Sequence, residues 1–147
     1  MARLIYEFFR PRVSLTVAAP IGVIAQDDKG VVYRAVRSVE LADKEEQAFY
    51  RLEDREHFMN ADFLSRLELV DPASGEHAAL DGSDPRVLDV LRDRGTHHFI
   101  YSPVEERSGS ADKVAAGEVE RLEDKDARRE LVLRFADEVT RAVLEAI

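Results

Sequence analysis

The first third of the chain carries apolar residues in the patterns that β-strands produce. Residues 3–9 are apolar at both odd and even positions and rich in branched and aromatic side chains, which predicts a strand buried on both faces. Residues 13–17 alternate valine and leucine with serine and threonine, the period of a half-buried strand. The prolines at positions 11 and 20 separate these segments and end each predicted strand.

A hairpin is predicted over residues 21–36. Two segments rich in valine, isoleucine and tyrosine flank a polar loop that runs from Asp27 to Gly30. A short polar loop that closes on glycine between two such segments is typical of a β-hairpin, because glycine can adopt the positive φ that the turn requires.

After residue 39 the pattern becomes helical, and we expect helices over residues 44–52, 56–67 and 85–93. Asp43 is a predicted N-cap of the first helix, and Glu46 follows it at the spacing of a capping box. Asp84 and Pro85 are the preferred residues for the cap and first position of the third helix, which should end at Gly95.

Two exposed loops and one more strand are predicted in the second half of the chain. Residues 71–85 gather aspartate, proline, serine and glycine, which are typical of loops. Residues 105–118 are also polar and predict a second exposed loop. Between them, residues 97–101 (His-His-Phe-Ile-Tyr) predict a strand that could join the N-terminal sheet.

Residues 126–146 carry the strongest helical pattern of the chain. Their apolar residues, from Leu131 to Ala146, occupy one sector of a helical projection and predict an amphipathic C-terminal helix. Leu133 and Leu144 fall on the opposite side, roughly three turns apart. Either they are exposed or covered by the same chain, or they contact a second copy and form a homodimer.

Together these elements predict an α+β fold in one domain spanning residues 1–147. Three or four N-terminal strands, with residues 97–101 as an added strand, should form an antiparallel sheet. The middle and C-terminal helices should pack on one face of it. A length of 147 residues is usual for one hydrophobic core.

Charge divides the chain into two parts of opposite sign. Residues 1–39 carry six basic and three acidic side chains, a net of +3, so residues 40–147 carry −12 of the total of −9. The acidic balance argues against general binding of the whole molecule to nucleic-acid phosphates. Arginine outnumbers lysine by 17 to 4, a skew typical of GC-rich bacterial genomes.

The composition also bears on location. The chain contains no cysteine, so it has no disulfide and no thiolate chemistry, as is usual in a reducing cytoplasm. No apolar segment is long enough to cross a membrane, and charges at Arg3, Glu7 and Arg10 interrupt any secretory signal. We therefore expect a cytoplasmic protein with no membrane partner.

Candidate catalytic or metal-binding residues are few. His97 and His98 are adjacent, but neighbouring side chains of a strand point to opposite faces, so both cannot hold one ion. One of them could join a carboxylate such as Glu7 or Asp62, although a structural role is favoured. Asp27 and its neighbour lie in the predicted turn, where aspartate is favoured without a metal. No cofactor is predicted.

Four arginines of the basic segment are the better candidates for binding an anion or a partner: Arg10, Arg12, Arg34 and Arg37. Guanidinium groups that converge can hold a phosphate, a nucleic-acid backbone or a carboxylate. The alternative, which we favour, is that they pair with the acidic helices of the same domain.

These observations favour a non-catalytic protein-interaction or regulatory domain that binds a protein partner or itself. A first alternative is a small enzyme that acts on a phosphorylated substrate through an arginine clamp, with Glu7, Asp62 or His97 as the base. A second is a protein that binds nucleic acid through its basic sheet, or mimics it through its acidic surface.

Overall fold

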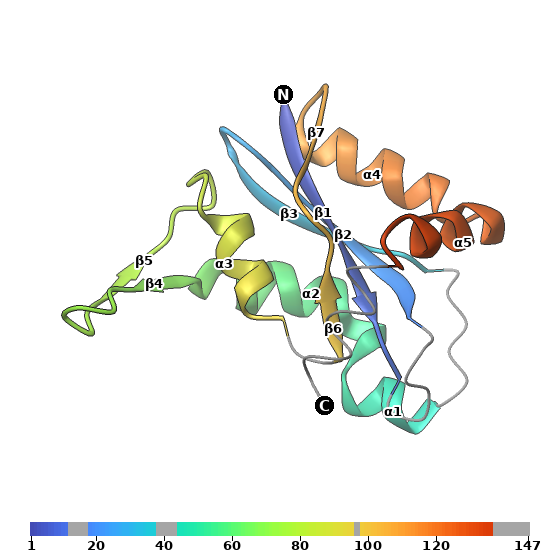
Figure 1. Ribbon diagram of the computed structural model, residues 1–147, viewed down its shortest axis with the longest axis horizontal. Helices are drawn as coiled ribbons and strands as arrows, with labels where there is room; N and C mark the ends of the chain where they lie inside the picture. The colour runs from blue at the N-terminus through green and yellow to red at the C-terminus, as the bar shows by residue number, and fades with distance from the viewer. Residues whose placement is uncertain (12–17, 38–43, 96–97, 137–147) are drawn as a thin grey trace.

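The computed structural model describes residues 1–11, 18–37, 44–95 and 98–136 (Figure 1). The strands are β1 (Ala2–Phe9), β2 (Ala19–Asp27), β3 (Gly30–Ala35), β4 (Glu68–Val70), β5 (His77–Ala79), β6 (Phe99–Tyr101) and β7 (Glu105–Arg107). The α-helices are α1 (Lys44–Phe49), α2 (Arg55–Phe58), α3 (Val87–Asp93), α4 (Ala111–Arg121) and α5 (Lys125–Arg134). The short helical turn η1 (Leu52–Asp54) lies between α1 and α2, and the turns η2 (Met59–Phe63) and η3 (Leu64–Arg66) lead from α2 to β4.

Within the described residues, β1, β2, β3, β6 and β7 form an antiparallel sheet. The order is β3-β2-β1-β6, and β7 pairs with the other half of β1. The α+β fold, the N-terminal sheet and its added strand near residues 97–101 are therefore confirmed. The strand predicted over residues 13–17 lies outside the described residues.

The predicted hairpin is present, with β2 and β3 joined by Asp28 and Lys29. Gly30 has a φ of 151°, which glycine adopts without steric cost. Both carboxylate oxygens of Asp27 accept backbone hydrogen bonds, from Lys29 N at 2.8 Å and from Ala111 N at 2.8 Å. The turn residue thus also satisfies an amide at the start of α4.

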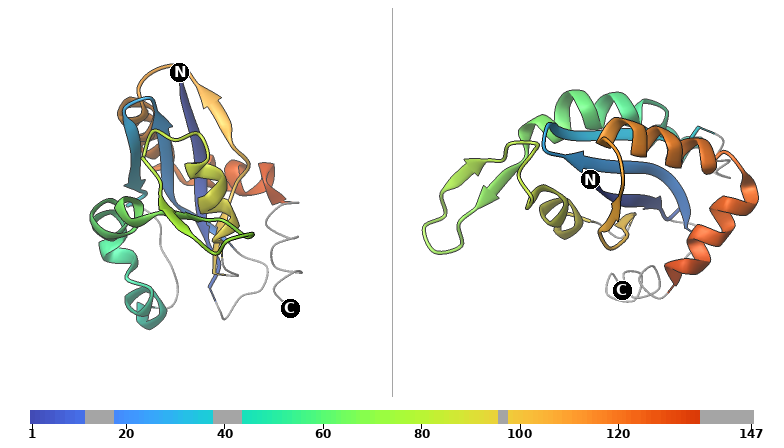
Figure 2. Two further views of the ribbon diagram at one scale, coloured as in Figure 1. Left: turned by 90° about the vertical axis from the view of Figure 1, so that its left-hand side faces the viewer. Right: turned by 90° about the horizontal axis from the view of Figure 1, so that it is seen from above.

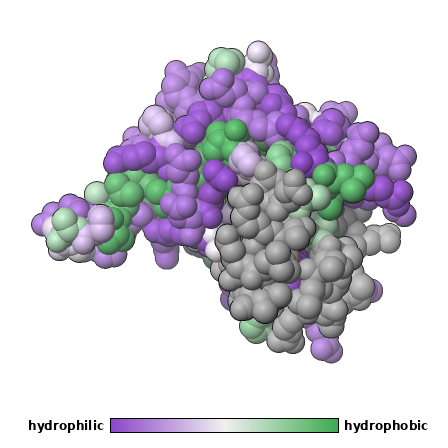
Figure 3. Space-filling model, viewed as in Figure 1, coloured by the Kyte–Doolittle hydropathy of each residue, from purple (hydrophilic) through white to green (hydrophobic). Residues whose placement is uncertain are grey.

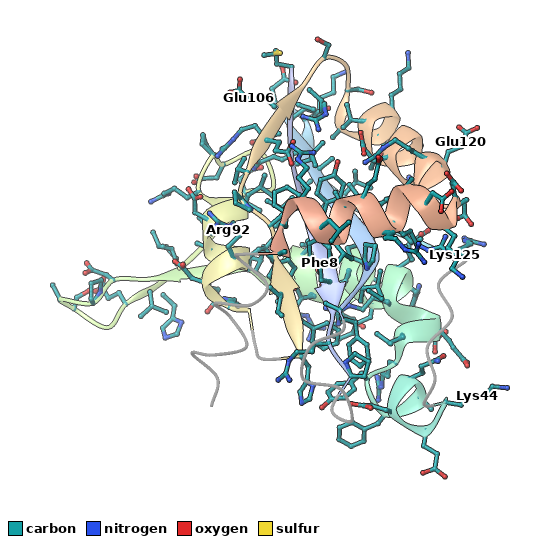
Figure 4. The ribbon with its side chains drawn as sticks, turned by 45° about the vertical axis from the view of Figure 1, so that its right-hand side comes forward. Phe8, Lys44, Arg92, Glu106, Glu120 and Lys125 are labelled. Atoms are coloured by element: carbon teal, nitrogen blue, oxygen red, sulfur yellow. The ribbon has the colours of Figure 1, made fainter. Side chains whose placement is uncertain are left out.

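Both faces of the sheet are covered, so the expectation of a single covered face is wrong. The even-numbered residues of β1, such as Leu4 and Phe8, pack with α4 and α5, whereas Ile5 packs with η2 and α3. The labelled Phe8 lies beside α5 (Figure 4), and its ring centroid is 6.3 Å from that of Phe135. This arrangement follows from the apolar character of β1 at both parities.

The prediction of an exposed loop over residues 105–118 is also wrong, because this segment contains β7 and most of α4. Ser110 caps α4 by accepting a hydrogen bond from Lys113 N. The buried face of the helix consists of alanine and valine, namely Ala111, Val114 and Ala115. Such small side chains give a weak apolar pattern, which the charged residues between them obscured.

Residues 71–85 are loop-like as predicted, except that β5 lies within them and pairs with β4. The two strands and their turn form an arm that projects from the side of the molecule opposite α4 and α5 (Figures 1 and 2). In the terminal helix, Leu131 and Phe135 are buried, as the amphipathic pattern predicts. The remainder of that predicted helix, from residue 137, lies outside the described residues.

Gly22 and Gly117 allow a matched pair of substitutions with opposite expected effects. A Cβ on Gly22 would lie 2.1 Å from the hydroxyl oxygen of Tyr33, whereas a Cβ on Gly117 has no neighbour within 4 Å. We expect Gly22→Ala to lower the free energy of unfolding by about 2–3 kcal/mol through overpacking. Gly117→Ala should raise it by about 0.5–1 kcal/mol, because alanine favours the helix. Urea unfolding followed by circular dichroism checks both, and equal effects of the two variants would contradict the close packing at Gly22.

Candidate functional site

The predicted arginines do not gather at one site. Arg10 immediately follows β1, is 5% exposed, and donates its backbone N–H to the carbonyl of His98. Arg34 lies on β3 and pairs with Asp112 of α4 at 3.4 Å. Arg37 is exposed just after β3. Arg12 lies outside the described residues, so the described members of the set form no common anion clamp.

Arg37 lines a pocket of about 340 Å³ between the end of β3 and the α1–α2 region. The charged residues of its lining are Arg37, Arg55, Glu53 and Glu56. Arg55 is bound to the buried Glu7, and Glu56 accepts a hydrogen bond from Ala35 N. Because Glu7 neutralises Arg55, the lining places Arg37 beside two carboxylates, Glu53 and Glu56, and does not favour an anion.

The other candidate residues also occupy separate environments. Leu133 is 68% exposed on α5, whereas Leu144 lies outside the described residues. His97 is likewise outside them, and His98 packs against the ring of Tyr50, with centroids 4.8 Å apart. Asp62 is exposed beside Arg66. In the part of the chain that the structure describes, no group of three or more histidine and carboxylate side chains could hold a metal ion.

The buried polar centre of the molecule is a network around Glu7 that joins three strands to α2. Tyr33 from β3 and Tyr101 from β6 donate their hydroxyls to the carboxylate at 2.7 Å and 2.8 Å. Arg55 from α2 donates Nε at 3.0 Å and Nη2 at 2.7 Å. The Arg55 guanidinium also lies 4.0 Å from the centroid of the Phe99 ring.

This geometry describes a structural centre rather than a reactive one. Glu7 is fully buried, and its two oxygens accept four hydrogen bonds from protein donors. Burial, together with the Glu7 charge, raises the pKa of Tyr33 and Tyr101 above the usual range for tyrosine. Glu7 is thus fully occupied in holding α2 against the sheet.

Unlike the buried Glu7 network, the β4–β5 arm is exposed to solvent, and some of its backbone N–H and C=O groups face the solvent. All residues from 71 to 79 are exposed, and Val70 is 47% exposed. Figure 3 shows apolar surface along this arm, well separated from the apolar surface over α5. Leu69 packs against the core cluster that contains Ile5 and Leu88, and this contact anchors the arm to the rest of the molecule.

The hydrogen-bond register decides which backbone groups of the arm point outward. Asp71 N bonds to Glu76 O, and Leu80 N bonds to Leu67 O. Because hydrogen-bonded and non-bonded pairs alternate in an antiparallel ladder, the backbone N–H and C=O groups of His77 and Ala79 point away from β4. Among the described residues none supplies a partner for these groups, so β5 presents an open sheet edge.

The outer edge of β3 shows how the same molecule covers a strand edge elsewhere. The side chain of Asn60 accepts a hydrogen bond from Tyr33 N at 3.0 Å and donates to Tyr33 O at 2.8 Å. Glu56 accepts the next outward N–H, from Ala35, at 2.9 Å. These side chains take the place of a neighbouring strand. On the arm, Arg94 donates to the Glu68 carbonyl of β4, and β5 remains uncovered.

Carboxylates surround the uncovered strand. Residues 67–85 contain five acidic side chains, Glu68, Asp71, Glu76, Asp81 and Asp84, and no lysine or arginine. Glu68 pairs with His77, and Asp84 pairs with Arg86. Backbone and hydroxyl hydrogen bonds hold the pKa of Asp71 and Asp81 below the usual range for aspartate. Asp71, Glu76 and Asp81 have no cationic partner within the described ranges.

No single sequence signal identified this edge, because β5 reads His-Ala-Ala and resembles a loop. The recognisable features were the short polar turn and the absence of lysine or proline from residues 76–80. No helix among the described residues is long and apolar enough to cross a membrane. Comparisons of this chain with protein-family models, with curated proteins and with solved structures found no match.

Proposed function

We propose that this protein is a non-catalytic interaction domain that binds an extended segment of a partner protein at the outer edge of β5. The observation that carries the proposal is the open edge on a projecting arm, in a protein that covers the edge of β3 with Asn60 and Glu56. Addition of a strand to such an edge is a recurring mode of peptide recognition.

The side chains of β5 suit a strand that approaches closely. Ala78 and Ala79 are small, and β5 contains no proline, lysine or bulge of the kind that blocks pairing at natural edges. A two-stranded hairpin is only marginally stable by itself in water. A third strand would satisfy four outward backbone groups and cover part of the exposed Val70 region.

The proposal predicts that Ala79→Pro removes binding while Ala79→Thr keeps it. Proline deletes an outward N–H but no bond of the β4–β5 ladder, and it is tolerated at such edge positions. Random linear peptides selected from a phage-displayed library on the immobilised wild-type chain serve as probes. Their affinity should fall at least about tenfold for Ala79→Pro, because a backbone hydrogen bond is lost and the proline ring obstructs the edge.

Two further measurements keep this test decisive. Hydrogen exchange at the paired Leu69 and Ala78 amides reports whether the arm of Ala79→Pro remains folded. If those amides stay protected and the peptides bind both variants equally, the edge is not the binding site. A library that yields no enriched peptide would also overturn the proposal.

A further inference from the structure

The carboxylates around β5 indicate the chemistry of the segment that the edge accepts. We infer that the segment is cationic, with basic residues on either side of a short stretch of small or branched residues. This inference rests on the proposed strand addition, and adds to it the charge and spacing of the partner.

The positions of the charges follow from the register of the arm. Glu76 immediately precedes β5 and lies opposite Asp71, while Asp81 follows the strand by two residues. Two carboxylates therefore stand at one end of the open edge and one at the other. In an extended chain, the five steps from Glu76 to Asp81 span roughly 17 Å. A partner strand of the same length places a basic residue near each end.

The same charges decide against a second copy of the chain as the occupant. Pairing of β5 with β5 of a second copy would bring two such arms together, each with the uncompensated carboxylates of Asp71, Glu76 and Asp81. Like charges across paired strands are destabilising, and here no cation of the described arm offsets them. A cationic segment relieves this repulsion, and it is attracted to the arm before contact.

Three synthetic peptides of equal length test the inference on the full-length protein. Each alternates valine with a second residue, which is lysine, threonine or glutamate, so that β propensity is retained and charge varies. Fluorescence anisotropy of labelled peptide gives the affinity at low and at high salt. We expect the lysine peptide to bind at least about tenfold more tightly than the threonine peptide at low salt, and the glutamate peptide to bind weakest.

A matched pair of variants separates local from general electrostatics. Glu76→Gln removes a carboxylate beside β5, and Glu120→Gln removes an exposed one on α4, on the far side of the molecule (Figure 4). Glu76→Gln should lower the affinity of the protein for the lysine peptide about two- to fivefold, whereas Glu120→Gln should leave that affinity unchanged. Equal effects of the two variants would overturn the inference, because binding would then follow net charge alone.

The outcomes distinguish a failure of this inference from a failure of the proposed function. Peptides that bind irrespective of charge but lose binding in Ala79→Pro would support strand addition and overturn the cationic partner. Binding of the lysine peptide that Ala79→Pro leaves intact would overturn both. A concentration-dependent dimer in sedimentation equilibrium that Ala79→Pro abolishes would make a second copy the occupant, and would likewise overturn the cationic partner.

Discussion

Glu7→Gln should lower the free energy of unfolding by about 3–5 kcal/mol, the usual cost of removing one partner from a buried ion pair. The substitution keeps the shape of the side chain but leaves the Arg55 guanidinium, whose side chain is 11% exposed, without its anion. Each carboxylate oxygen of Glu7 accepts two hydrogen bonds, and the substitution replaces one of these oxygens by an amide nitrogen, which cannot accept them. The tyrosine hydroxyls can rotate to accept a hydrogen bond, but the guanidinium cannot.

Urea unfolding followed by circular dichroism measures this loss, and two further variants define its cause. Glu120→Gln, on the exposed face of α4, should change the stability by less than about 0.5 kcal/mol. The double variant Glu7→Gln/Arg55→Met removes both charges and should recover a large part of the loss, because a neutral pair carries no uncompensated buried ion. A double variant as unstable as the sum of the two single variants would show that the residues act independently.

The position of Glu7 explains which parts of the fold the sequence could predict. The unbroken apolar run of residues 3–9 and the Asp27–Gly30 turn between two β-rich segments are local features of the sequence, and they predict β1, the hairpin and the α+β class correctly. The two covered faces were also implicit in β1, because a strand that is apolar at both parities needs a cover on each side. The alternative in which Glu7, Asp62 or His97 serves as a base does not anticipate the role of Glu7 in the fold, since a single charge within an apolar strand does not reveal its hydrogen-bond donors.

The donors of Glu7 come from positions that only the folded sheet brings together. Tyr101 lies directly opposite Glu7 in the β1–β6 pairing, and Tyr33 reaches it over Gly22, which lies opposite Glu7 on β2. These partners are 26 and 94 residues away in sequence. A glycine within a strand was the one local signal, because it marks a place where another group approaches the backbone closely.

The candidate interaction surface was even less accessible to sequence reasoning. The four arginines of the basic segment share a charge and a stretch of sequence, yet Arg10 is buried and Arg34 pairs with Asp112. The β5 edge depends instead on which backbone groups lack a partner. That property is set by the register of β4 and β5 and by the absence of a cover, and neither is encoded in the side chains of β5 themselves.

Stability should also fall steeply above about pH 10, because the tyrosines of the Glu7 network can ionise only when the protein unfolds. Burial and the adjacent Glu7 carboxylate raise the pKa of Tyr33 and Tyr101 above the usual tyrosine value of about 10. Above pH 10 the unfolded chain therefore binds fewer protons than the folded protein. The free energy of unfolding consequently decreases as pH rises, and stability from this source is fully present below pH 10.

The two tyrosines together should remove about 3 kcal/mol of stability for each pH unit above the unfolded pKa, since each contributes about 1.4 kcal/mol per unit. On the other face of the sheet, burial and the Glu118 carboxylate raise the pKa of Tyr6 to about 12, which adds to the loss in the same direction. Urea unfolding at a series of alkaline pH values measures the slope. Phenolate absorbance, recorded in parallel, should rise together with the loss of helical circular dichroism.

Tyr101→Phe provides the control for this slope, because it deletes one of the two ionising groups around Glu7. The variant should lose some stability at neutral pH, roughly 1–2 kcal/mol for the missing hydrogen bond to a charged acceptor. Between about pH 10 and 12, where Tyr6, Tyr33 and Tyr101 all contribute in the wild type, its decline with pH should nevertheless be about two-thirds as steep, so the two stability curves converge as pH rises. Phenolate absorbance that rises to completion while the circular dichroism stays native would contradict the prediction. The tyrosines would then ionise beside Glu7 within the fold, and the network could not be the closed structural centre that its hydrogen bonds describe.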